Sequence, residues 1–317
     1  KEVLERLRRV GRSVRNVGLI GLGAMGRGVA ENLVAKGYPI VGFDVRPEMR
    51  DWLAQRGGVF ANTVGEVAKQ CPVVISFVVN DVQTEEVVFG AQGLVESMQA
   101  GGVVITCSTM PPEYVSQLAS RLSARSIHLL DAPVTGGAAG VAKGSLTIMA
   151  AGEKEVFEQV KPILETFGTR VHYVSDQHGA GSQLKVINQL LCGVHLAAAG
   201  EALALAKRQG LPLDVTMDVL RSGAGSSWML CDRGPRMVSE AFYDVTSAVD
   251  IFVKDLGLVL DAARSAKFAA SLASAAHNAF LAVSGEGKGR WDDSAVMTNY
   301  GVSPYAGEIP LPERLSG

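Results

Sequence analysis

The chain has 317 residues, of which 47% are hydrophobic and 20% charged, and its formal net charge is −2. This composition is typical of a soluble globular protein with room for two domains, and it supplies no bulk positive field that would recruit nucleic acid or an anionic membrane. The longest uncharged stretch in the middle, residues 186–200, contains Asn188, Gln189 and His195, so we expect no membrane-spanning segment.

The four cysteines, Cys71, Cys107, Cys192 and Cys231, lie far apart and form no C-x-x-C pair. We interpret them as reduced thiols of an intracellular protein, and we expect no metal because no His/Cys cluster has ligand spacing. Residues 1–16 carry six Lys or Arg and two Glu. This basic N-terminal segment could be a helix, a linker or a targeting remnant. We therefore expect a cytoplasmic protein, or an organellar one if the segment is such a remnant.

The first predicted strand, residues 17–20, enters a glycine-rich turn. The turn is Gly21-Leu22-Gly23-Ala24-Met25-Gly26, with G-x-G-x-x-G spacing, and a helical pattern follows it. In such turns the first glycine allows the tight bend, the second admits a pyrophosphate, and the third lets the helix pack closely. A second strand, residues 39–44, ends in Asp44, eighteen residues after Gly26, where a carboxylate would reach the adenosine ribose. A dinucleotide site is therefore favoured over a purely structural turn.

Strand and helix patterns then alternate. We predict a helix over 47–55, buried strands over 71–79 and 102–109, a helix from Pro111-Pro112 to about residue 124, and a strand over 127–133. A strand over 145–152, a helix over 153–167 and a strand over 170–174 complete the series, and Asp81 can cap the helix that follows it. The alternation predicts an α/β domain over residues 17–178, with a Rossmann-type doubly wound parallel sheet.

The pattern changes at Gly179-Ala180-Gly181-Ser182, after which nothing breaks helical periodicity as far as Gln209. Such a helix would be about 42 Å long. Further helices are predicted over 213–221, 228–239, 249–266 and 272–283. The sequence thus indicates an all-α domain over residues 179–300, opened by a long inter-domain helix, and an extended C-terminal tail over 301–317.

Lys185 is the main acid–base candidate. It lies about one turn into the long helix, among Leu184, Val186 and Ile187. Desolvation and the positive end of the helix dipole both disfavour its ammonium, so we expect its pKa to fall from about 10.4 towards the working pH. Asn188 follows on the same face, where its amide can bind a substrate hydroxyl or carbonyl. The alternative for Lys185 is a side chain that simply reaches solvent.

Other candidates come from loops and from the later helices. Thr135 offers a hydroxyl, and Gly136 and Gly137 offer N–H groups that can form a nest for a substrate carboxylate, although a plain glycine turn is the alternative. Thr109 ends a strand at the carboxyl edge of the sheet, where ligands collect, so we expect a cofactor contact or a capping residue. Lys254, next to Asp255, belongs to an ion pair or to the site, and Trp228 to the site or the core. We expect none of the five histidines to be catalytic.

Together these motifs resemble the β-hydroxyacid dehydrogenase family, which includes 3-hydroxyisobutyrate dehydrogenases and tartronate semialdehyde reductases. The matching stretches follow the family order over residues 17–297, and they are 21–26, Ser108-Thr109, 131–137, 179–188 and Lys254-Asp255-Leu256. The resemblance implies that Lys185 is the general acid/base, that Asn188 holds the substrate, and that Lys254 lies beside the nicotinamide. It also implies that Thr135, Gly136 and Gly137 bind the carboxylate.

Two positions depart from the family pattern: Thr135 stands where Ser is more frequent, and Gln189 where many members have a second Asn. The helical half is most similar to the L-threonate dehydrogenase branch, through residues 189–195, 227–229, 248–256 and 292–296. Asn188 occupies a position that is often His in that branch. This similarity implies oxidation of L-threonate, a four-carbon sugar acid, at C2 with NAD, with 3-hydroxyisobutyrate or tartronate semialdehyde as alternative substrates.

Two other functions stay open at this point. A non-catalytic dinucleotide-binding module would not need Lys185, whose presence argues against it. An enzyme of the 6-phosphogluconate type would need a basic cluster for the phosphate, which the site stretches lack. We therefore expect an NAD-dependent oxidoreductase that acts on the CH–OH group of a small hydroxy acid. Asp44 favours NAD over NADP, although Arg46 could pair with a 2′-phosphate.

We also expect a homo-oligomer, a dimer or a tetramer, because Gly193, Ala197, Gly200 and Ala204 form a small-residue face on which another helix can pack, although that helix could belong to the same chain. The expected site therefore comprises the catalytic Lys185; the substrate-binding Thr135, Gly136, Gly137, Asn188 and Trp228; and the cofactor-binding Gly21, Leu22, Gly23, Ala24, Met25, Gly26, Asp44, Val79, Thr109 and Lys254.

Overall fold

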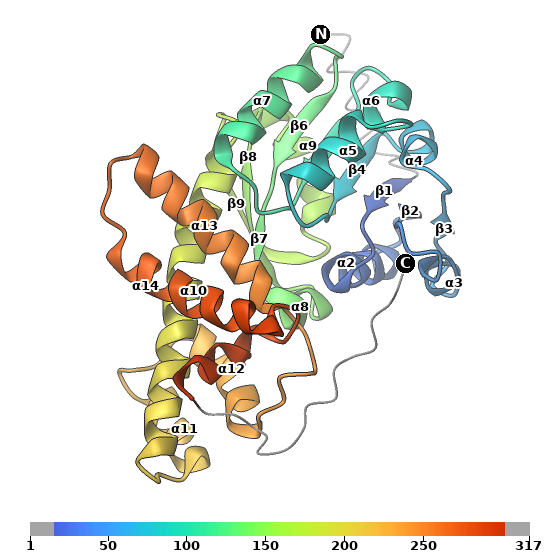
Figure 1. The fold of residues 1–317 in the computed structure, drawn as a ribbon. Coiled ribbons are helices and arrows are strands. Elements are labelled where there is room, and N and C mark those ends of the chain that lie inside the picture. The colour runs from blue at the N-terminus through green and yellow to red at the C-terminus, as the bar shows by residue number, and fades with distance from the viewer. Residues whose placement is uncertain (1–15, 302–317) are drawn as a thin grey trace. The chain divides into compact units, whose positions relative to one another are not determined.

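The structure is a computed structural model that describes residues 16–301. The expected basic segment and C-terminal tail lie outside the described residues, apart from Asn16 and Gly301. Two compact units are present, one extending to Ile187 and the other starting at Asn188. The change of unit falls inside one continuous helix, α10 (Ala180–Arg208), which can be followed in Figure 1. The helix that we expected to open the second domain therefore contributes its first two turns to the first unit.

The first unit is built on a sheet in which the described strands follow the order β3-β2-β1-β4-β5-β6-β8-β7, with β9 paired to β8. Neighbours from β3 to β6 are parallel, in the order typical of doubly wound nucleotide-binding folds. The expected Rossmann-type sheet is thus confirmed, with β8 running antiparallel to β6 and β7. The strands are β1 (Val17–Ile20), β2 (Ile40–Phe43), β3 (Val59–Phe60), β4 (Val73–Ser76), β5 (Val103–Thr106), β6 (His128–Asp131), β7 (Val134–Thr135), β8 (Leu146–Ala151) and β9 (Gly168–Ser175).

Helices cover both faces of this sheet (Figure 1). One core joins the sheet to helices that include α2 (Ala24–Ala35), α8 (Gly137–Ala142) and α9 (Lys154–Leu164). The other core includes residues of α4 (Val64–Gln70), α5 (Asp81–Phe89), α6 (Leu94–Ser97) and α7 (Pro112–Ser123), while α3 (Met49–Ala54) adds Leu53 to the first. Central strands are Val- and Ile-rich because both of their faces are buried. This arrangement fixes the carboxyl edge of the sheet, where the candidate site lies.

The second unit contains the rest of α10 and the helices α11 (Leu213–Ser222), α12 (Trp228–Ser239), α13 (Val249–Ser265) and α14 (Ser271–Val283). A short π-helix, η1 (Ser284–Lys288), and a 3-10 helix, η2 (Asp293–Tyr300), follow. A Cβ added at Gly193 would lie 2.7 Å from Leu256 of α13, and one at Gly200 would lie 3.1 Å from the Met297 nitrogen of η2. The small-residue face of α10 therefore packs within its own chain, so it gives no argument for an oligomer.

Three local expectations were wrong. Asn80, and not Asp81, caps α5: its side chain accepts a hydrogen bond from the Gln83 N–H at 2.9 Å, and Asp81 is the first helical residue, where a carboxylate still favours the helix dipole. β5 ends at Thr106, so Thr109 lies in the loop beyond the strand. The segment after Pro133, expected to be a loop, contains β7 and α8.

Among the described residues, α10 is the one helix long and apolar enough to cross a membrane by length and composition, and half of its most apolar stretch is buried inside the protein. Burial of this kind is typical of the core helix of a globular protein, which is in keeping with the expectation that no segment spans a membrane.

Candidate active site

The glycine turn joins β1 to α2 with little room to spare at two of its three glycines. Gly21 has φ +88°, and a Cβ there would lie 2.7 Å from the Phe77 carbonyl oxygen. A Cβ at Gly26 would lie 1.9 Å from the Gly21 carbonyl oxygen, so any side chain would force the first turn of α2 away. A Cβ at Gly23, by contrast, would meet nothing within 4 Å. The turn is thus closed against the protein at Gly21 and Gly26 and open at Gly23, as a pyrophosphate cradle requires.

Asp44 lies directly after β2 and is tied to this turn. Its Oδ2 accepts a hydrogen bond from the Leu22 N–H at 2.6 Å, and the Arg46 guanidinium donates to both carboxylate oxygens at 2.9 and 3.0 Å. Burial opposes ionisation of Asp44, but the hydrogen bonds from Arg46 and Leu22 outweigh it and lower the pKa of the carboxyl. Asp44 is therefore ionised at neutral pH, and Arg46 is engaged with it.

These residues fit a dinucleotide. Gly23 is the N-cap of α2, and the first turn of that helix holds no acidic residue, so its N–H groups present a positive end to an anion. Asp44 places an ionised carboxylate next to the same turn, as a ribose diol requires. The remaining expected contacts in this unit follow neighbouring strands: Val79 lies beyond β4 and is 47% exposed, and Thr109 lies beyond β5. The Ser108 hydroxyl donates to the Val78 carbonyl at 2.6 Å and so joins these two loops.

The expected carboxylate-binding residues follow β6 at the same edge of the sheet. Gly136 and Gly137 both have positive φ, +121° and +61°, and Gly136 is the N-cap of α8. α8 packs on α2: the Asn32 amide of α2 donates to the Val141 carbonyl at 2.7 Å. A Cβ at Gly28 would lie 2.6 Å from Val141. The helix that follows the expected carboxylate-binding residues is therefore packed directly against the helix expected to hold the cofactor phosphates.

Lys185 lies in the first two turns of α10, which belong to the first unit. It is buried, with 7% of its surface exposed, and Val186 beside it is also buried, whereas Leu184 and Ile187 are 39% and 60% exposed. The alternative in which Lys185 extends into solvent is therefore wrong. Of the apolar neighbours in the sequence, only Val186 is buried with it.

In the second unit the remaining candidates form one hydrogen-bonded series. The Asn188 amide donates to Gln189 Oε1 at 2.9 Å and to Cys192 Sγ at 3.3 Å. The Gln189 amide donates to Asp255 Oδ2 at 2.5 Å, and Lys254 Nζ lies 2.6 Å from Asp255 Oδ1. Sequence reasoning noted Gln189 as a departure from the family and missed its position as the link between Asn188 on α10 and Lys254 on α13. No sequence signal pairs residues 66 positions apart.

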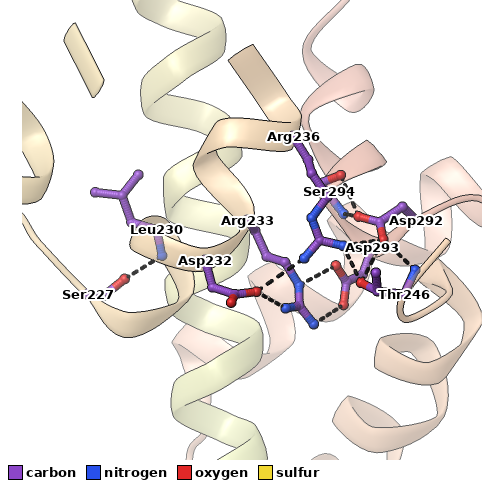
Figure 2. Close-up of polar contacts among 9 residues, drawn as sticks. All are labelled: Ser227, Leu230, Asp232, Arg233, Arg236, Thr246, Asp292, Asp293 and Ser294. Atoms are coloured by element: carbon purple, nitrogen blue, oxygen red, sulfur yellow. Dashed lines mark hydrogen bonds and ion pairs between the residues drawn. The ribbon is translucent and has the colours of Figure 1, made fainter. Parts of the chain in front are cut away.

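Trp228 is the first residue of α12 and is 54% exposed, so it is not a core residue. The Ser227 side chain caps this helix by accepting from the Leu230 N–H at 3.0 Å. Further along α12, two arginines enter a largely buried ion network (Figure 2). Arg233 donates to Asp293, and Arg236 donates to Asp232 and Asp292. The Ser294 hydroxyl also donates to Asp292. In the sequence, residues 292–296 stand out only as part of the family resemblance, and nothing there pairs them with Arg233 or Arg236. The network joins α12 to the start of η2 and thereby fixes the helix that presents Trp228.

No metal centre is indicated: the described residues contain no group of three or more His, Cys, Asp or Glu that could hold a metal ion. The four cysteines are free thiols, and burial raises the pKa of the Cys71 thiol to about 12. Neither finding alters the chemistry expected from the lysine and the cofactor site.

Comparison with known proteins bears on both units. The model of the NAD binding domain of 6-phosphogluconate dehydrogenase matches residues 16–175, and that of the NAD-binding domain of NADP-dependent 3-hydroxyisobutyrate dehydrogenase matches residues 179–300. The chain is 46% identical to the L-threonate dehydrogenase of Cupriavidus necator over 283 residues, which are 89% of this chain and 95% of the relative.

A second relative, the L-threonate dehydrogenase of Pectobacterium atrosepticum, is 41% identical over 299 residues, which are 94% of this chain and 96% of the relative. Among solved structures, a 3-hydroxyisobutyrate dehydrogenase from Salmonella typhimurium is 42% identical with a TM-score of 0.85, covering 89% of this chain and 99% of that one. These proteins share a fold and a reaction type with this chain, and their names differ in the substrate.

Proposed function

The chain belongs to the β-hydroxyacid dehydrogenase family of 3-hydroxyisobutyrate dehydrogenase-like enzymes, and from this premise we propose that it oxidises L-threonate at C2. It is an NAD-dependent dehydrogenase that acts on the CH–OH group of a hydroxy acid. The observation that carries the choice of substrate is the identity of 41–46% to L-threonate dehydrogenases over at least 89% of the chain. 3-Hydroxyisobutyrate is the second candidate, because a structure of that name is 42% identical.

The proposed roles of the first unit are to bind the cofactor and the substrate carboxylate. The turn from Gly21 to Gly26 and the Asp44 carboxylate hold the cofactor's pyrophosphate and adenosine ribose. When bound, NAD supplies a nicotinamide ring that accepts hydride from the carbinol carbon. Thr135, Gly136 and Gly137 donate to the substrate carboxylate. These assignments rest on position at the carboxyl edge of the sheet, on the open face of Gly23 and on the positive φ of both loop glycines.

Lys185 is the proposed acid–base group. In oxidation its neutral Nζ takes the hydroxyl proton as hydride leaves the carbinol carbon, and in reduction its ammonium returns that proton to the carbonyl oxygen. Its burial supports the assignment, because desolvation favours the neutral amine. Asn188, held by Gln189 and Cys192, positions the substrate oxygen, and the Asp255 carboxylate orients Lys254 for the nicotinamide end.

The test combines a substrate panel with two variants. L-threonate, D-threonate, 3-hydroxyisobutyrate and glycerate are each assayed with NAD and with NADP, and tartronate semialdehyde with NADH and with NADPH; L-threonate with NAD should give the highest kcat/KM. Lys185→Ala should lower kcat by about 10²–10⁴-fold, the usual contribution of general acid–base catalysis, with NAD affinity within a few-fold. Asn188→Ala should affect both KM and kcat, because a positioning hydrogen bond serves ground and transition states.

A matched control is Lys69→Ala, which removes an exposed lysine from α4 and should leave kcat unchanged. Near-normal kcat in Lys185→Ala would show that another group, with Lys254 the next candidate, carries the proton. A preference for 3-hydroxyisobutyrate over L-threonate would overturn the choice of substrate while leaving the enzyme class intact.

We also propose that the enzyme is a homo-oligomer and works inside the cell. The described surface of the second unit includes an open groove of about 350 Å³ whose lining is mostly apolar, with Val194 and Leu272 beside the polar Glu201 and Asn278, and Leu272 is 70% exposed. An apolar surface of this kind favours contact with another copy. A dimer or tetramer is expected by light scattering at micromolar concentration, and a single monomeric species would contradict it. The free state of all four cysteines supports a reducing compartment.

A further inference from the structure

Asp131, the last residue of β6, is fully buried and reaches the start of α10. Its Oδ2 accepts a hydrogen bond from the Ser182 N–H at 2.7 Å, and its Oδ1 accepts one from the Ser182 hydroxyl at 2.8 Å. The Gly179 N–H donates to the same carboxylate. Ser182 is the third residue of α10, and Lys185 follows one turn later. A carboxylate from a distant strand thus caps the helix that carries the proposed acid–base group.

The first turn of α10 also lies unusually close to the strands. A Cβ at Gly181 would be 2.4 Å from the Met149 carbonyl oxygen and 2.9 Å from that of Asp131. Overlap with two backbone oxygens cannot be relieved by turning a side chain, so only glycine allows this approach. A second anchor comes from α7, where the Ser116 hydroxyl donates to the His178 carbonyl at 2.8 Å. The helix start is therefore held in one place by contacts on two sides.

The stability of the folded protein does not explain why a carboxylate, rather than a neutral side chain, stands at this position. Burial raises the pKa of Asp131 to about 6 against the opposing hydrogen bonds from Ser182 and Gly179, so the ionised group lowers stability at neutral pH. A neutral Asn or Ser would cap a helix as well. The titratable neighbour in the adjacent loop is Cys107, whose thiol stays protonated because burial and the Asp131 charge raise its pKa. Of these two groups near the start of α10, Asp131 is therefore the one that is ionised at neutral pH.

We propose that Asp131 is a positioning residue for Lys185: by capping the first turn of α10 it fixes the place of the amine one turn further along the helix. This inference rests on the proposed role of Lys185. The same residue begins the segment 131–137, and the Ala132 N–H is bonded to the Thr106 carbonyl at 2.8 Å. One strand end therefore sets the position of the proton-transfer group and of the proposed carboxylate-binding loop together.

The main test is Asp131→Asn, which keeps the shape but removes the charge and leaves one acceptor oxygen where the carboxylate uses two for the Ser182 N–H and hydroxyl. We expect kcat to fall by about 10–100-fold, as small misplacements of a catalytic group do, while the Kd of NAD, measured by fluorescence titration, stays within a few-fold. KM for L-threonate should change by less than kcat does, because Asp131 acts through the placement of Lys185 and is not itself assigned to the substrate. Amide exchange of residues 176–187, followed by mass spectrometry, should become faster.

Two further variants keep the inference falsifiable. Ser182→Ala keeps the Asp131 charge and its bond from the Ser182 N–H but removes the bond from the Ser182 hydroxyl, so it should lower kcat by several-fold. Ser116→Ala removes the other anchor without touching Asp131, and its kcat should stay within about two-fold of wild type. If Asp131→Asn does not fold, the test is the comparison of kcat between Ser182→Ala and Ser116→Ala, in which Ser182→Ala should be the slower enzyme.

The inference is overturned if Asp131→Asn, or Ser182→Ala in its place, keeps kcat within two-fold of wild type, or if NAD affinity falls in parallel with kcat. The latter would mean that Asp131 supports the fold as a whole. Lys185→Ala is assayed in the same series. If that variant stays active, the proposed function of Lys185 fails, whereas the exchange rates of residues 176–187 still report whether Asp131 anchors the helix.

Discussion

Replacing Arg233 by Met should destabilise the helical unit by far more than the loss of a surface ion pair. Asp293 is completely buried, and Arg233 meets it with two hydrogen bonds, Nε to Oδ1 at 2.8 Å and Nη2 to Oδ2 at 3.2 Å (Figure 2). Burial raises the pKa of the Asp293 carboxyl, and Arg233 opposes that rise. Removal of one partner from such a pair leaves an uncompensated buried charge and typically costs about 3–5 kcal/mol.

The free energy of unfolding would be measured by urea titration, with circular dichroism and tryptophan fluorescence as separate probes because the two units need not unfold together. The matched control is Arg264→Met. That arginine pairs with Asp261 at 2.9 Å, but the two side chains are 79% and 66% exposed, so its loss should cost under about 1 kcal/mol. The double variant Arg233→Met/Asp293→Asn removes the stranded charge and should recover at least half of the loss.

The reasoning would be refuted by a loss in Arg233→Met no larger than that in Arg264→Met. It would also fail if the double variant were as unstable as the single one, because the cost would then come from lost packing of the arginine stem rather than from the buried carboxylate. A lower pH should shrink the effect of Arg233→Met, since protonation of Asp293 removes the uncompensated charge.

The other predictions concern the first unit. Gly26→Ala would place a Cβ 1.9 Å from the Gly21 carbonyl oxygen, so NAD affinity measured by calorimetry should fall by at least about ten-fold. Gly23→Ala, whose Cβ meets nothing within 4 Å, should leave the unfolding temperature unchanged. Equal unfolding temperatures for both variants would contradict the steric argument. For Asp131, the pKa rises from 3.8 to about 6 on folding, so its contribution to stability is fully present below about pH 4 and is lost as pH rises through 6. The free energy of unfolding of wild type relative to Asp131→Asn should therefore fall by about 2 kcal/mol between pH 4 and 7, and a difference independent of pH would show that Asp131 is not titrating there.

The sequence was a good guide wherever a local pattern has one structural solution. Buried strands rich in Val and Ile and a G-x-G-x-x-G turn predict the doubly wound sheet, although the strands over 71–79 and 102–109 are shorter than expected, and an unbroken helical stretch predicts α10 almost to the residue. The segment after Pro133 was misread because Gly137–Ala142 is so rich in Gly and Ala that it carries no apolar period, although Val141 alone is enough to seat α8 on α2.

Contacts between distant positions could not be predicted. Asp131 with Ser182, Gln189 with Asp255, and Arg233 with Asp293 are separated by 51, 66 and 60 residues, and no periodicity marks them as pairs. The small-residue face of α10 shows a related limit. Close packing requires Gly193 and Gly200 whether the opposing helix comes from the same chain or from another, so composition alone could not distinguish the two.

The unbroken course of α10 restricts how this enzyme can change over time. Lys185 and Asn188 lie on one helix with no proline in its 29 residues. Inserting or deleting a single residue between them would turn Asn188 by about 100° around the helix axis and move it by about 1.5 Å. Point substitutions at neighbouring positions can therefore diversify the choice of hydroxy acid, whereas length variation within this helix would separate the two residues angularly. New substrate preferences should thus arise by exchange of side chains here and by insertions only in the flanking loops.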